Sequence, residues 1–193
     1  MRDYARYLQG RMPAGTLVLQ QDGDEITLEC TLDYFTLVMR VLRDHTNCQF
    51  KLLTDITAVD YPTDPARFHI IYSLLSLRYN ARLRVKVRVD AATPVPTISH
   101  LYNSANWSER EVWDRFGVYF DGHPDLRRLL TDYGFEGHPM RKDFPTEGFT
   151  QVQYDAEAKR VTCTPRELSQ APRFSNYKSS WKQVPARKMV TPE

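Results

Sequence analysis

A strict two-residue alternation over residues 82–89 constrains the fold of this chain more than any other feature. A leucine and three valines alternate with four cations, Arg82, Arg84, Lys86 and Arg88. Successive side chains of a β-strand point to opposite faces, so the pattern predicts a strand with one buried and one charged face. Four cations on one side of a strand could contact phosphates. We favour a solvated edge strand, where charge prevents unwanted strand pairing, or a strand facing an acidic protein partner.

Four further segments have the pattern of strands. Residues 49–61 alternate between apolar and polar, and residues 67–78 are apolar on both faces, as in a central strand. Together with residues 82–89 they predict a three-stranded antiparallel meander. Near the N-terminus, residues 16–20 and 25–30 flank the turn signal Asp22-Gly23, which predicts a β-hairpin.

Helical spacing of apolar residues predicts several helices. One follows a possible N-cap at Thr31 and runs through Leu42, and a short one begins after Thr97. Another is predicted where Ser108 and Glu111 form a capping box, with Gly117 as its C-terminal cap.

A further helix is predicted from Pro124 to Gly134, because Leu126, Leu129, Leu130 and Tyr133 recur at helical spacing. The predicted fold is therefore α+β: an antiparallel β-sheet (hairpin plus three-stranded meander) with packed helices and an extended C-terminal tail. We place the α+β core domain at residues 1–145. Residues 146–193 form the tail, which is interrupted by prolines and is expected to order against another surface.

Composition excludes several classes of protein. The 193 residues are 41% hydrophobic and 26% charged, as in globular domains, and the net charge of +2 is too small for a surface built for nucleic acid. The most apolar stretches, residues 35–42 and 69–77, are far shorter than the roughly 20 residues of a bilayer-spanning helix. Any link to a membrane is therefore expected to be indirect.

Motifs for cofactor binding or nucleophilic catalysis are missing. The chain has no P-loop, no G-x-G-x-x-G fingerprint and no G-x-S-x-G elbow. Its cysteines, Cys30, Cys48 and Cys163, are far apart, which argues against a disulfide framework or a cysteine metal site.

Two histidines invite a metal hypothesis. His123 precedes Pro124 and Asp125, and His138 lies five residues before Asp143. The spacing does not fit a helical H-E-x-x-H pair, and a following proline favours extended or turn backbone. We favour structural histidines hydrogen-bonded in loops, with a metal ligand as the alternative.

Residues 107–145 are the densest segment of the chain in aromatic and charged side chains. The aromatic ones include Trp113, Phe116, Tyr119, Tyr133, Phe135 and Phe144. Aromatics with arginines and carboxylates are typical of a protein interface. The alternative is that the aromatics form the core and the charges pair with one another, and composition leaves both open.

This segment resembles the signature of the 30-kilodalton subunit of respiratory complex I, the proton-pumping NADH:ubiquinone oxidoreductase. That family includes the protein called subunit 9 where mitochondria encode it, and its bacterial counterpart. The matching residues, in order and spacing, are 109–111, 113–114, 116–117, 123–128, 131–139 and 141–145. A weaker resemblance extends over residues 55–80, 154–155 and 159–161, so about two thirds of the chain is covered.

The resemblance implies a structural and assembly subunit of the hydrophilic, matrix-side arm of NADH:ubiquinone reductase, without catalytic residues of its own. It implies no cofactor bound by this chain, with flavin mononucleotide, iron–sulfur clusters and quinone in partner subunits. The implied partners are the quinone-pocket subunit of the 49 kDa type and neighbouring iron–sulfur subunits, with no nucleic acid and no direct membrane contact. The implied location is the matrix side of the mitochondrial inner membrane, or the cytoplasmic side of a bacterial inner membrane.

The residues expected at the partner interface are those of the signature: Glu109, Arg110, Glu111, Trp113, Asp114, Phe116, His123, Asp125, Arg127, Arg128, Asp132, Tyr133, His138, Arg141, Lys142 and Asp143. In the tail, from about Pro172 onward, Phe174, Tyr177 and Trp181 are expected to anchor an extended strap on a neighbouring subunit. One position departs from the family, because Arg115 stands where an apolar residue is usual. Its spacing from Glu111 favours an i,i+4 ion pair and puts one contact of the inherited interface in doubt.

Two other functions remain open. The equivalent subunit of a related ferredoxin-dependent dehydrogenase or membrane-bound hydrogenase would have a similar sequence. A nucleic-acid binding module, built on the basic strand and the tail, would bind with a steep salt dependence.

Overall fold

The structure, a computed structural model, describes residues 17–22, 25–168 and 170, and near the N-terminus Tyr4, Tyr7, Leu8, Gly10 and Met12. The chain divides into two compact units, one that ends at Gly148 and one that begins at Phe149. Each unit is described by itself.

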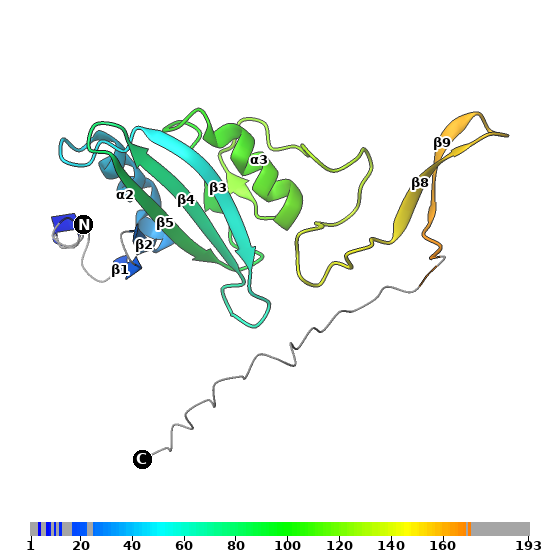
Figure 1. Cartoon of the computed structure of the whole chain (residues 1–193), viewed down its shortest axis with the longest axis horizontal. Coiled ribbons are helices and arrows are strands. Elements are labelled where there is room, and N and C mark those ends of the chain that lie inside the picture. Colours follow the sequence, from blue (N-terminus) through cyan, green and yellow to red (C-terminus); the bar gives the residue numbers. More distant parts are fainter. Residues whose placement is uncertain are drawn as a thin grey trace, which may run out of the picture. The chain divides into compact units, whose positions relative to one another are not determined.

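The first unit is built around a five-stranded sheet with the strand order β1-β2-β5-β4-β3 (Figure 1). Its strands are β1 (Leu17–Asp22), β2 (Glu25–Cys30), β3 (Leu52–Asp60), β4 (Phe68–Ser76) and β5 (Ala81–Val89). β1 and β2 form the predicted hairpin, and β3, β4 and β5 form the predicted meander. β2 and β5 pair in parallel, so the sheet is mixed and mostly antiparallel.

The position of β5 corrects the interpretation of the basic strand as an edge strand. β5 lies between β2 and β4 and is hydrogen-bonded to both. Its cations therefore cannot serve to prevent strand pairing. The predicted alternation itself is confirmed, since Val85 and Val87 are fully buried and the neighbouring Arg84 and Arg88 are exposed.

The helix α2 (Leu32–Asp44) packs on one face of the sheet (Figure 1). Its buried residues recur at helical spacing, and the ring of Phe35 lies with its centroid 4.8 Å from that of Tyr72 on β4. Thr31 takes the predicted N-cap position, although its side chain makes no capping hydrogen bond.

The helix α3 (Ala105–Phe116) ends as predicted and begins earlier than predicted. Gly117 is the C-cap, in the left-handed conformation with φ of 75°. Ser104 is the N-cap residue, whereas Ser108 lies inside the helix and donates to the Ser104 carbonyl at 3.5 Å. The predicted capping box between Ser108 and Glu111 is therefore wrong.

Two predicted helices are absent from the described residues. After β6 (Val95–Pro96), which pairs with β7 (Phe120–Asp121), the chain makes only turns at residues 99–104. Residues 124–134 form a loop rather than a helix. Their N–H groups at positions 129–131 donate to the side chain of Asp114, so they are not available for helical hydrogen bonds.

The second unit contains a hairpin of β8 (Thr150–Asp155) and β9 (Arg160–Pro165), where the sequence predicted only an extended tail. Both strands are mostly exposed, and Val152, Tyr154 and Val161 are each more than half exposed. Without a buried face the strands lack the alternation by which strands are recognised. The predicted strap anchors Phe174, Tyr177 and Trp181 lie outside the described residues.

Among the described residues no helix is long and apolar enough to cross a bilayer. The three cysteines are free, and Cys30 and Cys48 are buried.

Candidate protein interface

The C-terminal end of α3 binds residues further along the signature segment, which is the name used below for residues 109–145. The last four carbonyl groups of a helix have no partner inside it. Here the Gly117 N–H donates to the Trp113 carbonyl at 2.8 Å, and the His138 ring Nδ1 donates to that of Asp114 at 3.0 Å. The Met140 N–H donates to the Arg115 carbonyl at 3.1 Å, and Arg141 Nε donates to that of Phe116 at 2.6 Å. Residues 138–141 thus complete the helix end, which fixes their own position.

Asp114, fully buried, holds the middle of the segment. Its carboxylate accepts the backbone N–H groups of Leu129, Leu130 and Thr131 at 2.7–3.2 Å. It also accepts the Thr131 hydroxyl at 2.6 Å and Arg128 Nη1 at 3.0 Å. Burial alone would raise the pKa of Asp114, but the hydrogen bonds from Thr131, Leu130 and Leu129 outweigh it and hold the pKa well below its usual range. The carboxylate is therefore a charged anchor for the loop.

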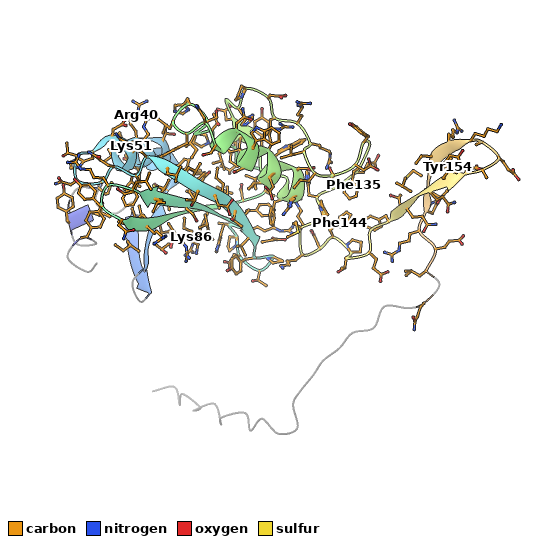
Figure 2. All side chains as sticks on the ribbon, turned by 45° about the horizontal axis from the view of Figure 1, so that its top comes forward. Arg40, Lys51, Lys86, Phe135, Phe144 and Tyr154 are labelled. Carbon is orange, nitrogen blue, oxygen red and sulfur yellow. The ribbon has the colours of Figure 1, made fainter. Side chains whose placement is uncertain are left out.

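Arg128 lies between two aromatic rings of the segment. Its guanidinium carbon is 5.8 Å from the ring centroid of Trp113 and 5.8 Å from that of Phe135. Phe135 in turn faces Phe144, with 5.9 Å between the centroids (Figure 2). These contacts stabilise the loop by cation–π and aromatic packing.

A second ion-pair group joins the end of the segment to the sheet. Arg67 binds the carboxylate of Asp60 through Nε at 2.6 Å and Nη2 at 2.7 Å, and its Nη2 lies 3.0 Å from Asp143. The Lys142 N–H donates to the same Asp60 carboxylate at 2.7 Å. The hydrogen bond from Arg67 is the main cause of the lowered pKa of Asp60. Asp60 and Arg67 were not among the predicted site residues, and their only signal was their place in the weaker resemblance over residues 55–80.

Glu109 and His123 fix the start of the segment on α3. Glu109 is fully buried and accepts the Thr97 hydroxyl at 2.5 Å and the Ile98 N–H at 2.9 Å. His123 Nε2 donates to the Asn106 carbonyl at 3.2 Å, and its Nδ1 accepts the Asp125 N–H at 3.1 Å. His123 and His138 are thus hydrogen-bonded loop residues, as the favoured interpretation held.

The signature residues divide by exposure. Four are buried and have internal contacts: Glu109, Arg110, Asp114 and Phe116. Six are half-buried: Glu111, Trp113, His123, Arg128, His138 and Arg141. Six are exposed: Asp125, Arg127, Asp132, Tyr133, Lys142 and Asp143. Only the last group, with parts of the second, is accessible to another molecule.

Besides Tyr119, which is 57% exposed and directly precedes β7, four large apolar side chains are exposed on and beside the segment. Their exposed fractions are 65% for Trp107, 55% for Leu130, 102% for Tyr133 and 48% for Met140. Trp107 is also 5.4 Å from the guanidinium of Arg110, measured to its ring centroid. Tyr133 was a predicted interface residue, whereas Trp107 on α3 and Leu130 and Met140 in the loop were not.

The i,i+4 ion pair of Arg115 with Glu111 is confirmed, with 3.1 Å between Nη1 and Oε1. Both residues line a groove of about 240 Å³ between α3 and β3, together with Met140. The departure from the family thus places a charged pair in the same groove as the exposed Met140.

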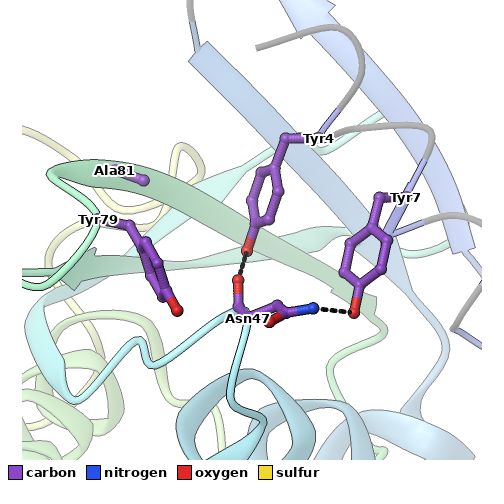
Figure 3. A pocket seen from close by; sticks show the side chains of 5 residues that line it. All are labelled: Tyr4, Tyr7, Asn47, Tyr79 and Ala81. Carbon is purple, nitrogen blue, oxygen red and sulfur yellow. Dashed lines mark hydrogen bonds between the residues drawn. The ribbon is translucent and has the colours of Figure 1, made fainter.

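A larger pocket, of about 400 Å³, lies elsewhere, at the turn before β3 (Figure 3). Its polar groups are engaged inside the chain: Tyr4 donates to the Asn47 carbonyl at 3.3 Å, and Asn47 Nδ2 donates to the Tyr7 hydroxyl at 3.0 Å. Tyr79 donates to the Thr46 carbonyl at 2.7 Å. Over the described residues, no group of three or more His, Cys, Asp or Glu side chains could hold a metal ion.

Fold and site together define a mixed-sheet α+β domain with an internally braced loop that exposes aromatic, aliphatic and charged side chains, as is typical of subunits of larger assemblies. The comparisons with known proteins agree with this class. Residues 28–150 match the family described as respiratory-chain NADH dehydrogenase, 30 Kd subunit.

Two curated relatives are similar over most of the chain. NADH-ubiquinone oxidoreductase subunit 9 of Reclinomonas americana is 56% identical over 160 residues, which cover 83% of this chain and 78% of that protein. The mitochondrial NADH dehydrogenase (ubiquinone) iron-sulfur protein 3 of Candida albicans is 48% identical over 194 residues, which cover 100% of this chain and 70% of that protein.

Two solved structures have a similar fold. A trypsin-resistant fragment of Nqo5 is 31% identical with a TM-score of 0.53, over 65% of this chain and 96% of that chain. A chain of the membrane-bound sulfane sulfur reductase, an archaeal respiratory membrane complex, is 25% identical with a TM-score of 0.64, over 75% of this chain and 85% of that chain. The chain belongs to the family of the 30 Kd subunit of respiratory-chain NADH dehydrogenase, which confirms the resemblance.

Proposed function

We propose that this chain is a structural and assembly subunit of the matrix-side arm of proton-translocating NADH:ubiquinone oxidoreductase in the mitochondrial inner membrane. Its partners would be the quinone-pocket subunit of the 49 kDa type and neighbouring iron–sulfur subunits. The relatives that support this location include proteins named as mitochondrial from Candida albicans and Neurospora crassa, at 48% and 46% identity.

The proposal rests on one observation: some side chains of the signature segment hold the loop in place, and others are exposed. Asp114, Arg128 and Arg141 are engaged inside the chain, and the loop they brace holds Leu130 and Tyr133 exposed. Exposed aromatic and aliphatic anchors on a rigid support are the features of an interface that binds without a large ordering cost.

We further propose that the chain supplies no catalytic group and binds no flavin, cluster or quinone. Its contribution would be geometric. Electron transfer and quinone access depend on partner subunits held in fixed positions, and a displacement of about an ångström is costly.

The experiment replaces the chain in a respiring cell by the double variant Leu130→Ala, Tyr133→Ala. We expect less assembled complex on a native gel stained for NADH oxidation, with unchanged turnover per assembled complex. The control is Leu77→Ala, a leucine that is 77% exposed in the turn between β4 and β5. Normal assembly with an altered quinone affinity would overturn the proposal.

The second candidate is the equivalent subunit of a related membrane-bound complex with another electron donor. The likeness to a chain of the archaeal sulfane sulfur reductase favours it. Purification of the complex with its partner subunits discriminates the two, because only the first contains a subunit that oxidises NADH.

A further inference from the structure

β3 is the last strand of the five-stranded sheet, and its outer edge is open. In the strand order β1-β2-β5-β4-β3 it pairs with β4, and over the described residues no strand pairs with its other side. Figure 1 shows β3 at the end of the sheet nearest α3. About half of the backbone N–H and C=O groups of an edge strand point away from the sheet. Such an edge can accept a further strand.

A groove runs along this edge rather than over a face of the sheet. It has a volume of about 240 Å³ and touches four consecutive residues of β3, from Asp55 to Ala58. Successive side chains of a strand point to opposite faces, so a groove that touches all four follows the edge. The opposite wall belongs to α3 and is formed by Glu111, Val112, Arg115 and Phe116.

Contacts within the chain close both ends of the open stretch. At one end, Ser104 Oγ donates to the Leu53 carbonyl at 3.2 Å. At the other end, the Lys142 N–H donates to the Asp60 carboxylate at 2.7 Å. Residues 55–58 lie between these contacts and span about 13 Å, at about 3.3 Å per residue. This length is enough for a short added strand.

β3 lacks the features by which edge strands usually avoid pairing. Such strands are very short, or they carry lysine, proline or a bulge. β3 has nine residues and contains no Lys, Arg or Pro. Its register shift lies between Leu53 and Asp55, so residues 55–58 pair regularly with β4. These features favour an edge that is paired in an assembled state.

The side chains that line the groove favour an apolar side chain of the occupant. Ile56 and Val112 are buried apolar residues at its walls, and Met140, which also lines it, is 48% exposed. The charges of Glu111 and Arg115 compensate each other in an ion pair of 3.1 Å. The groove thus offers an apolar contact beside a row of backbone hydrogen-bonding groups.

An extended segment fits this edge better than a helix. A helix with its side chains is about 10–12 Å wide and pairs its own backbone groups, so it leaves those of the edge unpaired. An extended segment pairs with the edge through its backbone, and alternate side chains enter the adjacent groove.

We propose that an extended segment of a partner subunit pairs with residues 55–58 of β3 as an added strand and places an apolar side chain in the groove between β3 and α3. Met140 belongs both to this groove and to the signature segment. The groove is therefore continuous with the surface that the proposed function assigns to partner subunits. The inference rests on that function, because its occupant comes from the assembled complex.

The first test maps the occupant by photo-cross-linking in the assembled complex, with p-benzoylphenylalanine in place of Asp55 in one variant and of Thr57 in another. Both side chains are exposed, and Thr57 Oγ1 donates to the Asp55 carboxylate at 2.9 Å, so they share a face. We expect both to react with one partner segment, at positions centred two residues apart, the period of a strand. The control position is Leu77, 77% exposed between β4 and β5, which should not react with this segment.

The other outcomes of this test contradict the inference. Cross-links centred three or four residues apart would assign the edge to a helix. Cross-links to a second copy of the chain, or to its own residues 172–193, would exclude a partner subunit as the occupant. An assembled complex without cross-links from either position overturns the inference and leaves the proposed function standing. A chain that enters no complex contradicts both.

The second test compares amide hydrogen exchange of residues 55–58 in the free chain and in the complex by mass spectrometry. About half of these amide protons face the open edge, and we expect them to exchange at least about tenfold more slowly in the complex. The rest pair with β4 and should be protected in both states. Equal exchange in the two states would refute the added strand.

The third test places a carboxylate in the groove. Met140→Asp should lower the yield of assembled complex several-fold at an unchanged melting temperature of the free chain. The backbone N–H of Met140 keeps its hydrogen bond of 3.1 Å to the Arg115 carbonyl, so the loop is retained. The control, Leu77→Asp, adds the same charge at an exposed turn and should assemble normally. Equal assembly of the two variants would show that no apolar side chain occupies the groove.

Discussion

Gly117, the C-cap of α3, lies against the side chains of His138 and Arg141. Its φ is 75°, and a Cβ there would lie 2.4 Å from Arg141 Nη2 and 2.5 Å from the His138 ring. His138 cannot move away without breaking its hydrogen bond to the Asp114 carbonyl. The glycine is therefore required by space as well as by backbone conformation.

We expect Gly117→Ala to lower the free energy of unfolding by about 3 kcal/mol or more, since strain and overpacking add. Gly134→Ala separates the two effects, because Gly134 has φ of 72° and no atom within 4 Å of a built Cβ. That control should cost only about 1–2 kcal/mol, the left-handed backbone term. Urea denaturation measures both, and equal losses would show that the close approach is unimportant.

Glu109 gives the domain a pH dependence of a definite sign. Burial raises its pKa to about 7, although hydrogen bonds from Thr97 and Ile98 oppose the shift. In the unfolded chain this carboxyl group loses its proton near pH 4.3. Between about pH 4.5 and 7 the folded state therefore binds more protons than the unfolded state. The free energy of unfolding falls as the pH rises through this range, by about 3 kcal/mol in all.

Glu109→Gln should remove this fall. Between pH 4.5 and pH 7.5 the free energy of unfolding should fall by about 3 kcal/mol less in the variant than in the unaltered chain. Denaturation at the two pH values measures this. Glu111→Gln controls for the loss of one negative charge from α3. A variant that keeps the full decrease would assign the pH dependence to other groups.

At the scale of elements, sequence patterns predicted those parts whose burial follows a period. The strands of the meander and α2 each have a buried face, so alternation and helical spacing located them. The interior position of β5 depends on its pairing with β2, whose paired residues are each 57 positions away in the sequence, and no local pattern reports it. The leucines of residues 126–130 have helical spacing, yet the distant Asp114 takes the N–H groups a helix would need.

The candidate site divides in the same way. The signature identified the segment, but not which residues face inward. Exposure of Trp107, Leu130 and Met140, and the pairing of Arg67 with Asp60, depend on contacts between distant parts of the chain.

The loop of residues 128–131 should loosen when Asp114 becomes neutral. In Asp114→Asn, an amide N–H₂ group would face N–H donors. The hydrogen bonds to the carboxylate contribute about 2–5 kcal/mol to stability, and the variant should lose part of this contribution. Amide protons of Leu129 and Leu130 should then exchange faster, while those of β4 and β5 stay protected. Asp132→Asn, at an exposed position, is the control and should leave exchange unchanged.

Acid should have the same effect on the unaltered loop. Because the folded pKa of Asp114 lies below its unfolded value, its contribution is present above about pH 4 and is lost as the pH falls further. Exchange in Asp114→Asn that matches the unaltered chain would show that the carboxylate does not hold the loop.

In the whole molecule, the part that forms the buried core differs from the part expected to contact partner subunits. The large buried side chains of the described core all precede Gly148, from Leu8 to Phe120. The β8–β9 hairpin is mostly exposed, and the residues beyond it are rich in cations. The matching Nqo5 fragment resists trypsin and covers 65% of this chain, in keeping with a core that folds without the rest.

Two truncations separate these roles. A chain that ends at Gly148 and a chain that ends at Ala171 should both unfold cooperatively, with melting temperatures close to that of the full chain, because neither removes a buried core residue. Calorimetry measures this. Assembly should fall in both, since residues from Pro172 onward are proposed to form a strap that orders only against a partner, where contacts offset about 1–2 kcal/mol of backbone entropy per residue. The full chain, expressed alongside, is the control. Loss of cooperative unfolding would place the removed residues in the core, and normal assembly of the shorter chains would show that the strap is not needed.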